Sequence, residues 1–284
     1  MSKAFLTVSV GDCHVGCRRG LCPPSVILDG GDEYRPSTAQ AASWASWLDF
    51  WTEMAQLAKA RRVQAVNVVF GGDMTDKNHH KPGATWSRNP KDIKAAAAEV
   101  ADVPFVKFKK IVPKIKIFAF VLRGTEAHVG RDAYIEEWLA EDISAEKSPC
   151  GAASWWTLDI VSGGVNLNFQ HHPEAASYRE HTDGNAARTC AAEIFLSYTR
   201  RELKPPKLAV RHHTHRFQDS GRNLPIHCLF NWGWQLTTSY GHRLGAGTKI
   251  LPIGGLWILC EEGQYQYDEL HYIPKRSGPW QQKQ

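Results

Sequence analysis

The stretch LTVSVGDCHVG, residues 6–16, predicts a buried strand that ends at two reactive side chains. A run of β-branched and apolar residues stops at Gly11, and Asp12 and His14 follow with one residue between them. Side chains at positions i and i+2 of a strand point to the same face, so both could reach one metal ion if the extended path continues. From this stretch alone, a loop with a capping aspartate and a solvated histidine is the favoured interpretation, because Asp-x-His is common by chance.

The composition is that of a globular protein with room for one large domain or two small ones. The chain has 284 residues, of which 43% are hydrophobic and 22% are charged. No run approaches 18 apolar residues, so we expect no membrane span. The net charge of +5 permits an anionic substrate without establishing one.

Cysteine usage favours a reducing compartment. The seven cysteines are an odd number and contain no Cys-x-x-Cys pair, which predicts free thiols and argues against a structural zinc protein. The first ten residues lack the apolar core and the cleavage site of a signal peptide. We therefore expect a cytoplasmic protein.

Strands and helices alternate through the first two-thirds of the chain, which predicts an α/β architecture with helices packed on a sheet. A helix capped by Ser37 or Thr38 carries a tryptophan stripe that is typical of core packing. A second helix is expected from about residue 91 to 99, with Pro104 interrupting or ending it. Beyond the opening strand, the remaining expected segments are strands 63–70, 114–122, 155–161, 165–172 and 207–211 and helices 132–143 and 186–203. From Gly221 onward the sequence predicts β-hairpins and loops.

Thirteen histidines are unevenly spread, and many follow predicted strands. Ligands bind at the carboxyl ends of strands in open α/β sheets. Mixed carboxylate and imidazole side chains suit zinc, manganese or iron better than calcium. The five strand ends that offer such residues are GDCH at 11–14, GGDMTD at 71–76, RGTEAH at 123–128, QHH at 170–172 and RHHTH at 211–215.

In this order, the five elements resemble those of the calcineurin-like metallophosphoesterases. That family carries Asp-x-His, Gly-Asp-x-x-Asp, Gly-Asn-His-Asp/Glu, an isolated His and Gly-His-x-His. The resemblance spans residues 12–215 and implies an α/β/β/α sandwich of two mixed sheets flanked by helices. We expect residues 1–284 to form a single domain, with residues 216–284 as a β-rich part that completes the second sheet.

The resemblance implies two divalent metal ions, with Mn, Zn, Fe or Ni as candidates. A hydroxide shared by the two ions would attack phosphorus. Asp73 would be catalytic because it would bridge the ions, and Asp76 would orient a neighbouring group. The remaining implied ligands are Asp12, His14 and His215 at the first ion and His171 and His213 at the second.

The third motif departs from the family pattern. Thr125 occupies the position of the asparagine ligand, and we carry it as a ligand of the second ion. Glu126 is an alternative ligand, although a solvated loop explains it equally well. His128 comes two residues later than the family's histidine, and a longer turn would still allow it to protonate the leaving group as a general acid.

Two places with adjacent histidines leave alternatives open, one about which ring binds metal and one about the backbone. Adjacent residues on an extended chain point opposite ways, so only one of His171 and His172 should reach the metals, and we choose His171. His212 stands where the family usually has glycine before the His-x-His pair. It either tolerates the tight turn or takes a left-handed backbone, and we expect a structural role for it.

Two residues outside the ligand set are candidates for substrate binding. His79 could line the pocket, with a solvated polar loop as the alternative. Arg123 could bind a phosphate oxygen bidentately or could pair with an acidic neighbour. For the tryptophans at 155, 156, 232 and 234, packing is the expectation rather than stacking on a base.

The expected function is metal-dependent hydrolysis of phosphate mono- or diesters. The phosphoester substrate remains open between a phosphatase, a phosphodiesterase and a nuclease, and nucleotides or nucleic acid fit the basic, tryptophan-rich chain. The alternative is a metallophosphoesterase-fold protein with impaired catalysis that serves as a binding scaffold. We expect no membrane partner, and the sequence does not define an oligomeric state.

Overall fold

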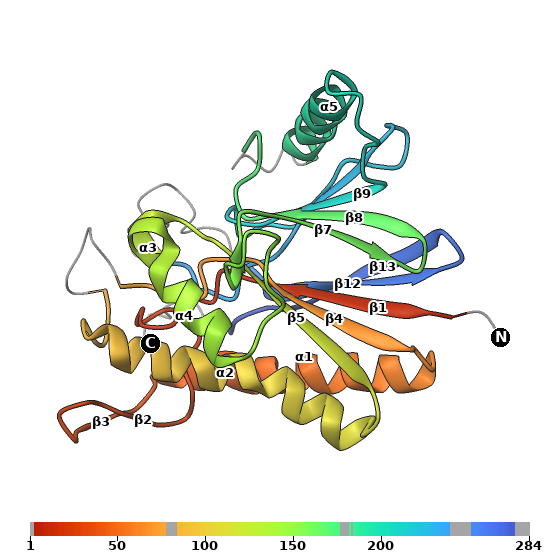
Figure 1. Ribbon diagram of the computed structural model, residues 1–284. Coiled ribbons are helices and arrows are strands. Elements are labelled where there is room, and N and C mark those ends of the chain that lie inside the picture. Colours follow the sequence, from red (N-terminus) through yellow and green to blue (C-terminus); the bar gives the residue numbers. More distant parts are fainter. Residues whose placement is uncertain (1–2, 78–83, 177–181, 183, 239–250, 276–284) are drawn as a thin grey trace, which may run out of the picture.

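The structure is a computed structural model that describes residues 3–77, 84–176, 182, 184–238 and 251–275. Two β-sheets pack face to face, with α1, α2 and α4 outside the first sheet and α5 outside the second (Figure 1). The chain therefore has the expected α/β/β/α arrangement of two mixed sheets flanked by helices.

The first sheet has the strand order β13-β12-β1-β4-β5-β6. Strands β1, β4, β5 and β6 run parallel, and the β12–β13 hairpin adds two antiparallel strands beside β1. Along β1, Leu6 and Val8 face the helices, whereas Thr7 and Ser9 contact polar side chains on the opposite face. The bounds of the six strands are Phe5–Val10 (β1), Ala65–Phe70 (β4), Lys116–Leu122 (β5), Ser154–Trp155 (β6), Ile253–Glu261 (β12) and Gln264–Tyr272 (β13).

The second sheet has the strand order β10-β11-β9-β8-β7. Its three central strands, β11, β9 and β8, are parallel, and each edge strand is antiparallel to its neighbour. The strands are Thr157–Ser162 (β7), Val165–Gln170 (β8), Leu208–Arg211 (β9), Gln218–Asp219 (β10) and His227–Phe230 (β11). A separate two-stranded sheet pairs Val26–Ile27 (β2) with Glu33–Tyr34 (β3).

The C-terminal part of the chain contributes to both sheets, which corrects the expectation for residues 216–284. β10 and β11 do extend the second sheet, but β12 pairs with β1 in the first, with Phe5 opposite Cys260. β12 is an apolar strand whose Leu256, Ile258 and Cys260 enter the core between the sheets. Burial of that face stabilises its pairing with the free edge of β1.

Helix α1, Thr38–Ala60, begins as the sequence predicts. Ser37 is the N-cap, and its side chain accepts a hydrogen bond from the backbone N–H of Gln40. Trp47 and Trp51 of the stripe are completely buried, which confirms their packing role. Trp47 makes an edge-to-face contact with Trp234, and this contact joins α1 to the C-terminal third of the chain.

Helix α2, Pro90–Ile111, is much longer than expected and continues through Pro104. Proline has no N–H to donate to the carbonyl four residues earlier, here that of Val100. The indole N–H of Trp47 donates to that carbonyl at 3.2 Å. The contact between α1 and α2 therefore satisfies the group that the proline leaves without a partner.

The remaining helices are short or lie on the second sheet. They are Glu126–Val129 (α3), Arg131–Ala133 (η1), Tyr134–Asp142 (α4) and Asn185–Thr199 (α5). All seven cysteines are free, as expected. Within the described ranges, no helix combines the length and apolarity needed to span a bilayer.

Candidate metal centre

Five loops meet where β1, β4, β5, β8 and β9 end. Backbone hydrogen bonds join four of them in two pairs. In the first pair, the N–H of Asp12 donates to the carbonyl of Gly72 and that of His14 to the carbonyl of Asp73, both at 2.9 Å. The N–H of His212 donates to the carbonyl of His171 at 3.0 Å. The carboxyl ends of parallel strands lie at one edge of a sheet, so these loops place their side chains in a common space.

One half of the cluster consists of Asp12, His14 and His215. The Nε2 atoms of the two histidines lie 3.3 Å apart, and Asp12 Oδ1 is 3.2 Å from Nε2 of His215. Two ligands of a tetrahedral ion with bonds of about 2.0–2.1 Å are separated by about 3.3 Å. The three side chains are therefore already spaced as ligands of one ion would be.

The other half gathers His171, His172 and His213 around Thr125. The hydroxyl oxygen of Thr125 lies 3.4, 3.2 and 3.3 Å from the nearest ring nitrogens of His171, His172 and His213, respectively. Both adjacent histidines reach the cluster, and the expectation that only one of them binds a metal stays a prediction. β8 ends at Gln170 and the chain bends at His171 and His172, so the alternation of an extended strand does not apply.

Asp73 lies between the two halves. Its Oδ2 atom is 3.1 Å from Nε2 of His171 and 4.0 Å from Nε2 of His14. Its Oδ1 atom accepts a hydrogen bond from the N–H of Thr125 at 2.6 Å. The bridging role that the resemblance implies for Asp73 stays a prediction, and the seven implied ligands lie together, from Asp12 to His215.

His128 joins the cluster through a helical turn. Thr125 is the N-cap of α3 and His128 is three residues later, a spacing that places the two side chains on one side of a helix. Nδ1 of His128 lies 3.2 Å from Oδ1 of Asp76, and its ring packs edge-on against that of His14. Burial would lower the pKa of His128, but the Asp76 and Asp73 carboxylates outweigh it and raise this pKa above its ordinary value.

The backbone at the cluster takes a conformation that L-residues rarely adopt. Asp12, His14, Asp73, His213 and His215 all have φ between 47° and 70°. Each such residue costs on the order of 1 kcal/mol, which the surrounding structure must offset. Left-handed residues concentrated in this way are typical of functional sites.

Glycines allow the loops to approach so closely. A Cβ atom on Gly72 would lie 2.6 Å from Nδ1 of His171, and one on Gly124 would lie 2.3 Å from Oδ1 of Asp73. Real Cβ atoms do not come this near to their neighbours. The motif glycines are therefore required by the space around Asp73 and His171.

The ionised carboxylates of the cluster suit cations, whereas His171 holds a proton that a metal ion would have to displace. Burial would raise the pKa of Asp12 and of Asp73, but contact with His215 and His171, respectively, holds both well below the ordinary range. Burial would lower the pKa of His171, but Asp73 outweighs it and raises this pKa to about 10. Desolvation and the neighbouring His171 and His213 lower the pKa of His172 to about 4. Two ionised carboxylates therefore lie among imidazoles.

Two buried polar atoms give an independent test of the donor set. Oδ1 of Asp12 and Nδ1 of His14 are buried and make no hydrogen bond of good geometry, although Oδ1 lies 3.2 Å from Nε2 of His215 and Nδ1 lies 3.7 Å from Oδ2 of Asp76. A buried carboxylate oxygen without a partner costs free energy unless something else contacts it. Four groups of carboxylate and imidazole donors lie within ligand spacing of one another, so these residues fit divalent ions.

A buried carboxylate that the sequence did not predict supports the centre. Glu136 of α4 accepts the N–H of Gly124 at 2.6 Å and that of Met74 at 3.1 Å. Burial and the charge of Asp73 raise the pKa of Glu136 to about 8. It ties the loop that carries Asp73 to the loop after β5. The sequence signal that could have identified Glu136 is its place on the same helix stripe as Ile135 and Leu139, both of which are buried.

His212 is a packing residue, as expected, and takes no left-handed backbone. Its ring is fully buried, and Nε2 lies 3.1 Å from Oγ of Ser9. Cβ atoms on Gly11 and Gly71 would lie 2.7 and 2.1 Å from this ring. Burial lowers the pKa of His212 to about 3, so the ring stays neutral.

The candidate substrate residues have mixed outcomes. Nε of Arg123 donates to Ser154 at 2.8 Å and Nη2 pairs with Glu137 at 3.4 Å, so Arg123 has the acidic neighbour of the second alternative. Glu126 is exposed and belongs to none of the four donor groups found among the described residues. His79 lies outside the described residues, and a substrate role for it or for Arg123 stays a prediction.

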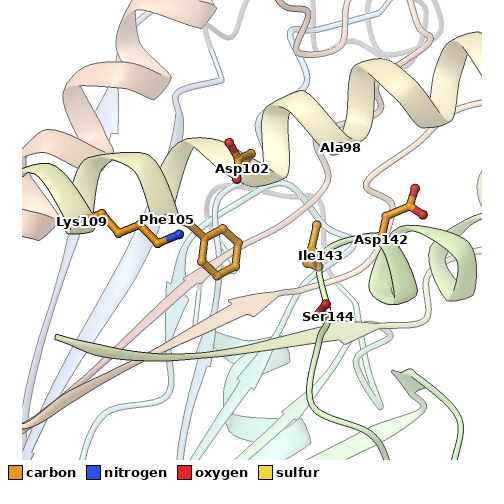
Figure 2. A pocket seen from close by; sticks show the side chains of 7 residues that line it. All are labelled: Ala98, Asp102, Phe105, Lys109, Asp142, Ile143 and Ser144. Atoms are coloured by element: carbon orange, nitrogen blue, oxygen red, sulfur yellow. The ribbon is translucent and has the colours of Figure 1, made fainter. Parts of the chain in front are cut away.

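Two hollows lie away from the cluster. Figure 2 shows one of about 370 Å³ between α2 and the end of α4, lined by Asp102, Phe105 and Asp142 among others. Another, of about 490 Å³, lies beside α5 and is lined by Glu174 and Arg211. Neither contains a residue of the four donor groups.

Comparisons with known proteins give structural neighbours only. No family model matches the chain, and no curated protein matches its sequence. A dimetal phosphatase from Danio rerio has 8% identity and a TM-score of 0.44, covering 95% of this chain and 99% of that one. Vps29 from Chaetomium thermophilum has 9% identity and a TM-score of 0.36, covering 95% and 100%. TM-scores below 0.5 carry no inference, so the function must be argued from the cluster itself.

Proposed function

We propose that this protein hydrolyses phosphate mono- or diesters with the help of two divalent metal ions. The observation that carries the proposal is the position of Asp73 between two groups of ligand-type side chains, 3.1 Å from His171 and 4.0 Å from His14. A carboxylate in this position can contact two ions at once. Paired ions held in this way are typical of phosphoester hydrolases.

The chain would hold the two ions with different residues. Asp12, His14 and His215 would bind the first, while Thr125, His171 and His213 would bind the second, with Asp73 contacting both. When bound, the ions would lower the pKa of a water molecule and neutralise the charge of the phosphoryl oxygens. Mixed nitrogen and oxygen donors suit manganese, zinc, iron or nickel.

His128 would donate a proton to the leaving oxygen. Neighbouring carboxylates raise its pKa above the ordinary value, which favours the protonated ring that a general acid needs. Asp76, 3.2 Å from Nδ1 of His128, would fix the ring so that the other nitrogen faces the substrate. This pairing explains how His128 can act although it comes late in its motif.

The test is hydrolysis of p-nitrophenyl phosphate and of bis(p-nitrophenyl) phosphate by the protein loaded with manganese, zinc, iron or nickel. Single-stranded and duplex nucleic acid complete the substrate panel. We expect turnover of at least one ester and its loss in Asp73→Asn. Asp268→Asn, which changes an exposed carboxylate on β13, is the matched control and should retain full activity.

Two results would contradict the proposal. Bound metal without turnover of any substrate in the panel would favour the binding scaffold, in which the fold and the ions remain but catalysis is lost. Turnover that survives in Asp73→Asn would show that the reaction does not use this cluster.

A further inference from the structure

His172 lies in the cluster but has no part in the ligand set proposed above. Its Nε2 atom is 3.2 Å from the hydroxyl of Thr125, and its ring centre is 4.7 Å from that of His171 and 4.9 Å from that of His213. One nitrogen from each of these three rings lies within 4.8 Å of the others. Three imidazole nitrogens this close together are spaced as ligands of one metal ion would be.

We propose that His172 is the third imidazole ligand of the second metal ion, in the coordination position that an amide would fill in the resembled family. The inference rests on the two-metal centre of the proposed function. Thr125 stands where the amide is expected, and a neutral hydroxyl is a poorer donor than an amide oxygen. The imidazole of His172, beside that hydroxyl, supplies the stronger ligand.

The local structure keeps this ring in place. The segment that follows β8 is fastened on both sides, since Nδ1 of His171 lies 2.7 Å from the carbonyl of Gly71 and Glu174 binds Arg211 through two hydrogen bonds. His172 lies between these two attachments. The residue is exposed, so its ring lies on the solvent side of the second half of the cluster.

The added nitrogen makes the two halves chemically different. With His172 in place of the Thr125 hydroxyl, the second ion would have three imidazoles and the shared carboxylate of Asp73, whereas the first would have two imidazoles and two carboxylates. Imidazole favours zinc, iron, nickel and copper, while carboxylate and water suit manganese and magnesium. The second position should therefore prefer zinc to manganese more strongly than the first.

The experiment measures metal binding to the full chain, independent of activity. Isothermal titration with zinc and then manganese gives the affinity of each position, and X-ray absorption of the zinc-loaded protein counts imidazole ligands. The variants are His172→Ala, which removes the ligand, and His172→Asn, which restores an amide. His271→Ala is the control, because His271 is a histidine on β13 outside the four donor groups.

We expect wild type and His271→Ala to bind two zinc ions with five imidazoles in total. His172→Ala should lose more than about 100-fold in affinity at one position, since even an outer partner of a ligand contributes 10- to 100-fold. The imidazole count should fall to four. His172→Asn should recover manganese affinity at that position without recovering the zinc preference, and circular dichroism should show every variant folded.

The outcomes separate this inference from the proposed function. Two zinc ions bound equally well by wild type and His172→Ala, with an unchanged imidazole count, would overturn the role of His172 whether or not the protein is a hydrolase. A wild-type count of five that falls to four in His172→Ala would support the ligand even if no ester is hydrolysed. A wild type that binds no zinc would overturn the inference about His172 alone, because the proposed function is also open to manganese, iron and nickel.

Discussion

The ion pair between Glu174 and Arg211 should hold the segment that carries His171 and His172, and replacement of Glu174 by glutamine tests this. Arg211 is 1% exposed and donates through Nε and Nη2 to the two oxygens of Glu174, at 3.0 and 2.8 Å. Nη1 of Arg211 donates to Asn168 at 2.9 Å. Glutamine keeps the shape and one acceptor but removes the charge that faces the guanidinium.

The expected cost follows from burial. Breaking a fully buried ion pair by removing one partner costs about 3–5 kcal/mol, because the other charge is left without compensation. The side chain of Glu174 is 28% exposed and glutamine retains one hydrogen bond, so about 2–3 kcal/mol of unfolding free energy should be lost. For a chain of this length, that corresponds to a fall in Tm of roughly 4–6 °C.

The pH dependence gives a second readout with a defined sign. Burial would raise the pKa of Glu174, but the hydrogen bonds and charge of Arg211 outweigh it and lower this pKa below 4.5. The contribution is therefore fully present above the pKa of the unfolded chain and is lost as pH falls through the folded value. The stability gap between wild type and Glu174→Gln should be constant above about pH 5.5 and shrink as the pH falls through the lowered pKa of Glu174.

Urea unfolding followed by tryptophan fluorescence, from pH 3.5 to 8, measures both effects in the metal-free protein. Glu193→Gln is the matched control, since Glu193 lines the same hollow and shows no ion pair among the contacts of the described residues. Its unfolding midpoint should equal that of wild type. An equal midpoint for Glu174→Gln at pH 7, or a stability gap that widens in acid, would refute the reasoning.

Three further predictions concern the helices, a motif glycine and the ions. Trp47→Phe should lower the free energy of unfolding in urea by about 1–2 kcal/mol, because the Val100 carbonyl loses its donor. The same change in a Pro104→Ala background should cost less, because the backbone N–H of the new alanine can donate to that carbonyl. Gly71→Ala should cost about 1–3 kcal/mol in the same assay, since its Cβ would lie 2.1 Å from the buried ring of His212; an unchanged midpoint would contradict this packing. Calorimetry with and without chelator should show a lower Tm without metal, because each ion at 100 times its Kd adds about 2.7 kcal/mol.

The parts of the fold that the sequence predicts correctly share a local cause. Asp12, Asp73 and His213 follow apolar runs, and the carboxyl ends of parallel strands necessarily come together at one edge. The capping box at Ser37 is likewise a property of neighbouring residues. Sequence predictions of this kind are correct where neighbouring residues alone determine the local structure.

The errors arise where a distant contact changes a local rule. Pro104 would end an isolated helix, but Trp47, from another helix, satisfies the carbonyl that the proline leaves open. The assignment of β12 to the first sheet depends on the free edge of β1, some 250 residues earlier in the chain. Glu136 lies on the buried stripe of α4, but the backbone N–H groups that it accepts come from the motif loops over which the helix packs. No window of neighbouring residues contains these partners.

The left-handed backbone at the cluster shows why ligand types can be predicted from sequence while ligand membership cannot. Aspartate and histidine tolerate positive φ better than β-branched residues do, so Asp12 and His215 carry a weak local signal for it. Whether the chain takes that conformation depends on partners elsewhere, such as the carbonyl of Gly72 that accepts the N–H of Asp12. His172 enters the cluster for the same reason, because the chain bends after β8 instead of continuing as a strand. The rule that side chains alternate along a strand does not apply after β8 ends, and its use there excluded His172. The folded chain brings Nε2 of His172 to 3.2 Å from the hydroxyl of Thr125.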